Sequence, residues 1–252
     1  ASKRQKIVND FANADRRILF LDYDGTLRSF VNSPDASKAM PSSSLLQILQ
    51  KLAFCPNTEI CIVSGRPRDA LDMWFKDLPL TLVAEHGAWT KLRSGWAKTP
   101  LDFTPHKRKL LPILRHYAER TPGALVEEKT CALVWHYRNV PTELAYVRNA
   151  SLQHELQRLV VDTDVSIYSG DKILEIKPRT IHKGNIVCEL AKKSQADFVL
   201  AAGDDCTDES MFEALPGDAH TVKIGLNSTC ARHQIVSVEA MHILLRDLAK
   251  AF

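Results

Sequence analysis

The sequence predicts an α/β protein: a doubly wound parallel-sheet core into which an α+β domain is inserted. Near both ends of the chain, short apolar runs alternate with helix-like segments, and each run stops at acidic, serine or glycine residues. In the middle of the chain, strand-like segments alternate apolar and polar residues and turn back as hairpins. The first pattern is typical of parallel strands buried on both faces, and the second of an antiparallel sheet with one covered face.

The N-terminal part of the core begins with an unbroken apolar run that ends at Asp22. Ser42 is placed to cap a helix that Pro56 then terminates, and Pro67 stands where the first turn of another helix is expected. The expected elements are, in order, a strand at 18–21, a helix at 42–54, a strand at 59–63, a helix at 68–75 and a strand at 81–84.

The pattern changes near Pro105 and returns after Pro178. We therefore expect an inserted α+β domain at 105–180, and a core made of 1–104 and 181–252. Gly170-Asp171 predicts a hairpin turn between two alternating segments. The expected elements of the insertion are helices at 110–120 and 144–161 and strands at 131–137, 165–168 and 173–176.

The C-terminal part of the core resumes the first pattern. Lys183-Gly184 opens a predicted helix, and the apolar run that follows it ends at an acidic stretch, Gly203 to Glu209. The expected elements are a helix at 185–193, a strand at 197–202, a short helix at 211–215, a strand at 221–225 and a closing helix at 238–249.

Composition excludes several classes of protein. The 252 residues are 45% hydrophobic and 25% charged, which is ordinary for a globular chain, and they contain no apolar run long enough to cross a membrane. A net charge of +3 gives no reason to expect nucleic acid as a partner. Six cysteines without a CxxC pair favour reduced thiols inside the cell.

The stretch from Asp22 to Thr26 carries the chemistry. On an extended backbone Asp22 and Asp24 point to the same side, just past the end of a buried strand, where open α/β sheets bind their ligands. Asp22 is placed to attack phosphorus, and Asp24 to give a proton to the leaving oxygen and take one from water. Gly25 permits a sharp turn, and Thr26 offers a hydroxyl and an N–H to phosphate oxygens.

Two other strand ends and a helix start add groups that handle phosphate. Ser64 and Lys183 can hold phosphoryl oxygens, while Asp22, Asp204 and the main-chain carbonyl of Asp24 can hold Mg²⁺. Each group alone also fits an ordinary turn, a surface lysine or a helix cap. Their joint occurrence at strand ends favours a phosphoryl-transfer site.

These motifs (DYDGT, SGR, KG and GDDCTDE) resemble the haloacid dehalogenase superfamily of phosphatases. AEHGA, VEEK, HYR and LEIKP extend the resemblance to the trehalose-6-phosphate phosphatase family. It implies a Rossmann-like core, a mobile cap and a cytoplasmic Mg²⁺ enzyme that hydrolyses a sugar phosphate, trehalose 6-phosphate. In fungi and plants such a domain often follows a synthase-like domain, which would fit a chain that starts without Met.

The resemblance also implies roles for individual residues. It makes Asp22 the nucleophile, Asp24 the acid/base and Asp204 a metal ligand, with Ser64 and Lys183 holding phosphate. Arg66 is implied as a further site residue. The sugar-binding residues implied in the cap are Glu127, Lys129, Arg138 and Glu175. The resemblance assigns no role to His86 or Cys206.

Two alternatives remain open from the sequence. One is another capped sugar-phosphate enzyme, such as a sucrose-phosphate phosphatase or a phosphomutase, since the core motifs do not separate these. The other is a non-catalytic domain that senses or binds sugar phosphate, although Asp22, Asp24, Lys183 and Asp204 are all present.

Overall fold

The structure, a computed structural model, describes residues 3–31 and 36–252 and divides into two compact units. One unit comprises Ala1–Thr99 and His182–Phe252, and the other comprises Pro100–Ile181. The chain thus leaves the first unit once and returns to it.

The first unit is built on an eight-stranded sheet with the order β12-β11-β10-β1-β2-β3-β4-β5. Strands β12 to β3 run parallel, whereas β4 and β5 form an antiparallel hairpin beside β3. The strands are β1 (Arg17–Leu21), β2 (Thr58–Val63), β3 (Thr81–Ala84), β4 (Trp89–Leu92), β5 (Gly95–Lys98), β10 (Phe198–Gly203), β11 (His220–Ile224) and β12 (His233–Ile235).

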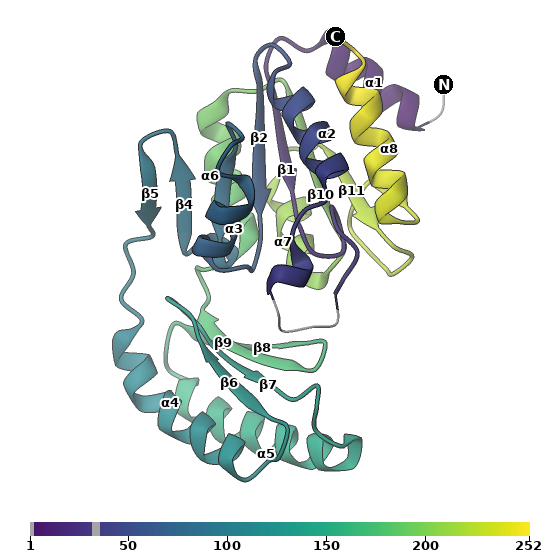
Figure 1. Cartoon of the computed structure of the whole chain (residues 1–252). Helices are drawn as coiled ribbons and strands as arrows, with labels where there is room; N and C mark the ends of the chain where they lie inside the picture. Colours follow the sequence, from purple (N-terminus) through teal and green to yellow (C-terminus); the bar gives the residue numbers. More distant parts are fainter. Residues whose placement is uncertain (1–2, 32–35) are drawn as a thin grey trace. The chain divides into compact units, whose positions relative to one another are not determined.

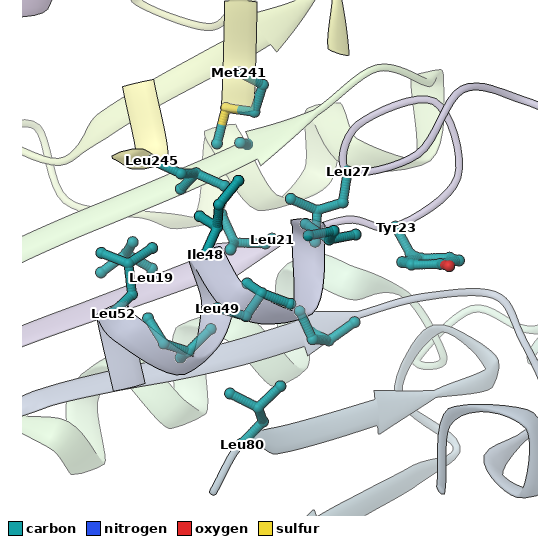
Figure 2. Close-up of a cluster of buried hydrophobic side chains, with 14 of the residues drawn as sticks. Leu19, Leu21, Tyr23, Leu27, Ile48, Leu49, Leu52, Leu80, Met241 and Leu245 are labelled. Carbon is teal, nitrogen blue, oxygen red and sulfur yellow. The ribbon is translucent and has the colours of Figure 1, made fainter. Parts of the chain in front are cut away.

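Helices cover both faces of this sheet (Figure 1). Alternate residues of β1 face opposite ways, so that Leu19 and Leu21 join one hydrophobic core and Ile18 and Phe20 join another. Figure 2 shows the first core, in which Leu21 of β1 lies among side chains from the helices at Ser43–Ala53 and Val238–Ala249. The helices are α1 (Lys3–Asn13), η1 (Ala36–Ala39), α2 (Ser43–Ala53), α3 (Arg68–Phe75), η2 (Glu85–Gly87), α6 (Lys183–Ser194), α7 (Cys206–Ala214) and α8 (Val238–Ala249), where η marks a 3₁₀ helix.

The topology fixes where a ligand can bind. From the central strand β1 the chain proceeds to β2 and β3 on one side, and from β10 to β11 and β12 on the other. The strand order therefore reverses between β1 and β10, and ligands of open α/β sheets bind at the carboxyl ends of strands at such a point. Asp22, Ser64 and Asp204 follow the ends of β1, β2 and β10.

The second unit is a four-stranded antiparallel sheet with the order β6-β7-β9-β8. Leu133, Trp135, Leu174 and Ile176 recur at every second position of β7 and β9 and form one apolar, fully buried face, while Val134 and Glu175 on the other face are buried as well. The elements are α4 (Thr104–Glu119), β6 (Leu125–Glu128), β7 (Leu133–His136), α5 (Thr142–Val160), β8 (Val165–Gly170) and β9 (Ile173–Pro178).

The α/β fold class predicted from the sequence is confirmed, and Ser42 caps α2 as expected, its side chain accepting the Leu45 N–H at 3.2 Å. Several elements were not predicted: α1, η1, η2, the β4–β5 hairpin, β6 and β12. The helix expected at 211–215 begins instead at Cys206, because Asp205 and Asp208 form a capping box there.

The described residues include no candidate for a membrane-spanning helix. No helix among them is long and apolar enough to span a bilayer.

Candidate active site

Asp22 lies at the centre of a group of charged side chains at the ends of β1 and β10. Its backbone N–H donates to the carbonyl of Ala202 at 3.0 Å, which continues the sheet ladder and fixes the residue. Lys183, the first residue of α6, donates to Asp22 Oδ1 at 2.6 Å. Asp22 Oδ2 is buried and has no hydrogen-bond partner among the described residues. One oxygen is thus held in place, while the other is left for a ligand.

The turn after Asp22 brings the ends of two strands together. Tyr23 is fully buried, and its hydroxyl donates to the carbonyl of Ala39 at 2.6 Å. Gly25 has φ +85°, and a Cβ there would lie 2.1 Å from Asp204 Oδ2. Thr26 donates to Asp204 Oδ1 at 3.3 Å. Glycine is therefore required both by the backbone conformation and by the close approach of Asp204.

Asp208 completes the carboxylate cluster, and the sequence analysis gave it no role. It is fully buried, and its Oδ2 accepts the backbone N–H groups of Asp204 and Asp205 at 2.9 and 3.0 Å. Its Oδ1 accepts from Lys183 at 2.7 Å. Gly203 permits this packing, since a Cβ there would lie 2.3 Å from that of Asp208. The signal in the sequence was an acidic residue three positions after the helix cap Asp205.

The cluster has the composition of a site for a hard divalent cation. Oxygens of Asp22, Asp204 and Asp208 lie within 4.8 Å of one another, the one such group of potential metal ligands found among the described residues. Oxygen ligands of this kind suit Mg²⁺, and the unpartnered Asp22 Oδ2 fits a missing positive charge. The residues present therefore fit the metal that the sequence predicted.

The electrostatics support the same interpretation. Burial raises the pKa of Asp22, and the neighbouring carboxylates Asp208 and Asp204 oppose the lowering effect of Lys183. Burial together with the charge of Asp208 raises the pKa of Asp204 to about 6. Burial alone would lower the pKa of Lys183, but Asp208 and Asp22 outweigh it and raise that pKa. Three carboxylates thus share one ammonium, and a cation would relieve the excess negative charge.

Asp24 is held by an arginine. Arg66 Nε and Nη2 donate to the two oxygens of Asp24 at 2.7 and 2.6 Å, a bidentate pair. The Arg66 N–H donates to Ser64 Oγ at 3.1 Å, and Ser64 N–H donates to the carbonyl of Val83 at 2.9 Å. The structure therefore ties the end of β2 to the loop after β1.

In the second unit, three of the four predicted sugar-binding residues lie near one another. Glu127 and Glu175 both stand opposite Val134 in the sheet register, and so they share a face. The Lys129 ammonium Nζ lies 3.6 Å from Glu175 Oε1. Burial alone would raise the pKa of Glu127, but the hydrogen bond from His136 and the charge of Lys129 lower it. Arg138 lies beyond the other end of β7, and it donates to Asp171 at 2.7 Å.

Comparison with known proteins decides the family. The family model described as trehalose-phosphatase matches residues 20–239. This chain belongs to the trehalose-phosphatase family. The predicted family and the interpretation as a phosphomonoester hydrolase are thereby confirmed.

Individual relatives agree with the family model. The chain is 39% identical over 244 residues to a bifunctional trehalose-6-phosphate synthase/phosphatase of Thermoproteus tenax. This match covers 96% of this chain and 33% of the relative. It is 35% identical over 240 residues to a trehalose-phosphatase of Saccharomyces cerevisiae, with 85% and 26% covered. This trehalose-phosphatase family member thus spans about a third or less of the length of these curated relatives.

A solved structure of the family matches the whole fold. The C-terminal domain of the trehalose-6-phosphate phosphatase of C. albicans superposes with a TM-score of 0.89 at 29% identity, and the match covers 100% of this chain and 99% of that one.

Proposed function

We propose that this chain hydrolyses trehalose 6-phosphate to trehalose and phosphate through a phosphorylated Asp22. The observation that carries the proposal is the state of the Asp22 carboxylate, which Lys183 fixes at Oδ1 and which keeps Oδ2 buried without a hydrogen-bond partner among the described residues. A nucleophile needs this combination of fixed orientation and an available oxygen. The names of the relatives support trehalose 6-phosphate as the substrate.

The reaction divides into two displacements. A carboxylate oxygen of Asp22 attacks phosphorus, the bond from phosphorus to the sugar oxygen breaks, and Asp24 gives that oxygen a proton. Asp24 then takes a proton from water, whose oxygen attacks the same phosphorus and displaces Asp22. Lys183 and Ser64 hold the remaining phosphoryl oxygens as charge spreads over them. Thr26 stands at the same strand end, where its hydroxyl donates to Asp204 and its N–H donates to the carbonyl of Tyr23, so binding phosphate would require Thr26 to exchange these partners.

Magnesium supplies the positive charge that neutralises the phosphate and the acidic cluster. We assign its ligands to Asp22, Asp204 and the main-chain carbonyl of Asp24. Asp208 lies among them and holds the backbone of Asp204, so we add it to the residues that shape this site.

Two anions, Asp24 and the substrate phosphate, compete for Arg66 in this scheme. It occupies both oxygens of Asp24 in the structure, although Asp24 must exchange a proton with the substrate. A substrate phosphate is a second anion that Arg66 can bind in the same bidentate manner. We therefore propose that phosphate binding draws Arg66 away and frees Asp24.

The second unit supplies the sugar-binding groups. We propose that Glu127, Lys129 and Glu175 bind sugar hydroxyls, because ionised groups make the strongest hydrogen bonds to such groups. Arg138 belongs to the same proposal through its family motif, and its contact with Asp171 would orient it at the edge of that face.

A phosphate-release assay on a substrate panel tests this function. The panel contains trehalose 6-phosphate, sucrose 6-phosphate, mannose 6-phosphate and an aryl phosphate, each with Mg²⁺ and with excess chelator. We expect the highest kcat/KM on trehalose 6-phosphate, and no turnover after chelation. A preference for another sugar phosphate would contradict the substrate, full activity in chelator would contradict the metal, and no release from any substrate would support a non-catalytic domain.

We also propose a cytoplasmic location and a synthase-like partner in the same pathway or polypeptide. The six cysteines are free thiols, of which Cys55, Cys61 and Cys131 are buried. That usage fits a reducing compartment. The bifunctional name of the Thermoproteus tenax relative supports the partner.

A further inference from the structure

Glu209, the last residue of the acidic stretch, has no part in the mechanism above but binds four different groups. Its Oε1 accepts from Lys223 at 3.0 Å. Its Oε2 accepts from the Thr229 hydroxyl at 3.0 Å, the Cys230 N–H at 2.9 Å and the Cys230 thiol at 3.0 Å. One carboxylate therefore ties α7 to β11 and to the loop that leads to β12.

Lys223 is the buried cation of this group. It is the fourth of the five residues of β11, with 2% of its surface exposed. Its ammonium donates to Glu209 and, at 3.3 Å, to the carbonyl of Asp205. A buried ammonium is costly unless it is paired, and Glu209 provides that pairing. The position of Lys223 is therefore set by the carboxylate, and the carbonyl of Asp205 is held by the lysine.

The backbone of Asp204 and Asp205 is held from two directions as a result. Asp208 accepts the N–H groups of both residues. Lys223 donates to the carbonyl of Asp205. Asp204 belongs to the carboxylate cluster, so any shift of this short segment moves its side chain relative to Asp22.

We propose that Lys223 and Glu209 are positioning residues that set the affinity of the acidic cluster for divalent metal. The inference rests on the metal site of the proposed function and adds to it a pair that does not belong to the cluster itself. Loss of an outer-shell partner typically weakens metal binding by about 10- to 100-fold. Because the pair acts through the backbone of Asp204 and Asp205, its removal should weaken the metal site without changing how substrate is bound.

The test measures binding of Mn²⁺ alone by electron paramagnetic resonance on the purified chain. We expect Lys223→Met to raise the Mn²⁺ Kd by about tenfold, and Lys223→Arg, which keeps the charge and the donors, to recover most of that loss. In assays, Lys223→Met should need about tenfold more Mg²⁺ for half-maximal rate, while KM for trehalose 6-phosphate at saturating Mg²⁺ stays within about twofold of wild type.

A matched control separates this effect from the general loss of a lysine. Lys193→Met breaks the exposed pair with Glu189 on α6 and should leave Mn²⁺ binding unchanged. If Lys223→Met does not fold, Glu209→Gln removes the charge that fixes Lys223 and should raise the Mn²⁺ Kd at least about threefold.

The outcomes distinguish this inference from the proposed function. Wild-type Mn²⁺ affinity in a folded Lys223→Met or Glu209→Gln variant would overturn the inference alone. If wild type binds no Mn²⁺, or if Asp204→Asn binds it as tightly as wild type, the metal site of the proposed function itself fails.

Discussion

At the scale of single residues, the proposed chemistry depends on Asp22. Asp22→Asn keeps the side-chain shape but removes the nucleophilic charge, and it leaves Lys183 with Asp208 as its charged partner. We expect phosphate release to fall below about a thousandth of the wild-type rate, since loss of a nucleophile typically costs more than that. The assay measures phosphate release from trehalose 6-phosphate at saturating Mg²⁺. Asp247→Asn, which removes a surface partner of Arg4, is the matched control and should keep the wild-type rate. A substantial residual rate in Asp22→Asn would contradict covalent catalysis.

The sequence identified residues at strand ends more readily than residues that act through others. Asp22, Ser64 and Asp204 were visible because short apolar runs mark buried strands and their ends. Asp208 was missed because it lies within the first turn of α7, where an acidic residue also serves as a helix cap. Asp208 belongs both to the capping box with Asp205 and to the carboxylate cluster, so the two interpretations of the acidic stretch do not exclude each other. The Arg66–Asp24 pair spans 42 positions of the chain, and no local pattern reports such a contact.

At the scale of elements, two histidines join α1, β11 and β12. His220 contacts Asp10 through Nε2 at 3.0 Å and His233 through Nδ1 at 3.3 Å. Burial lowers the pKa of His220 although Asp10 opposes it. Burial, then His220 and the nearby cations Lys3, Lys6 and Arg232, lower the pKa of His233. Folding therefore favours the neutral form of both rings.

This arrangement predicts a stability loss in acid. A base whose pKa is lowered by folding stabilises the fold fully above its unfolded pKa, about 6.5, and that contribution is lost as the pH falls through the folded value. We expect the wild-type chain to have a larger free energy of unfolding, measured in urea, than the His220→Gln variant at pH 7.5. The difference between the two should shrink as the pH falls from 6.5 to 5. Comparison with the variant cancels the carboxylates that titrate in the same range. A difference independent of pH would contradict this assignment.

Four of the elements that the sequence did not predict share a physical reason. α1 is polar and charged, and it buries Ile7 and Phe11 while presenting no long apolar stripe. The β4 and β5 strands are four residues each and half-exposed, so their alternation is weak. β12 has three residues and takes its structure from pairing with β11. Tertiary contacts rather than local propensity define these elements.

At the scale of the whole molecule, the proposed function assigns chemistry to one unit and recognition to the other. The carboxylates proposed to handle phosphate lie in the first unit, whereas Glu127, Lys129 and Glu175, proposed to bind the sugar, lie in the second. With such a division, changes in one unit can alter the substrate specificity while the other unit keeps the type of reaction. The same division also lets binding energy from the sugar, far from phosphorus, contribute to the chemical step.

The division makes a prediction about substrate choice. We expect Glu127→Gln or Glu175→Gln to lower kcat/KM for trehalose 6-phosphate by about 10- to 100-fold, since a charged hydrogen bond contributes about 1.5–3 kcal/mol. Activity on an aryl phosphate should barely change, because that substrate has no sugar for these residues to bind. Phosphate release from the two substrates, measured side by side, gives the comparison.

Glu128 offers a control that lies on the opposite face of the sheet from its neighbour Glu127. Successive residues of β6 point to opposite sides of the sheet, and Glu128 contacts Lys107 and Arg115 of α4. Glu128→Gln should therefore leave both activities at the wild-type level. If Glu127→Gln instead reduces both activities equally, the residue supports the fold of the second unit. If Glu128→Gln also loses activity on trehalose 6-phosphate alone, the sugar is not bound by one face of the sheet. The residues that bind it must then lie elsewhere in the unit.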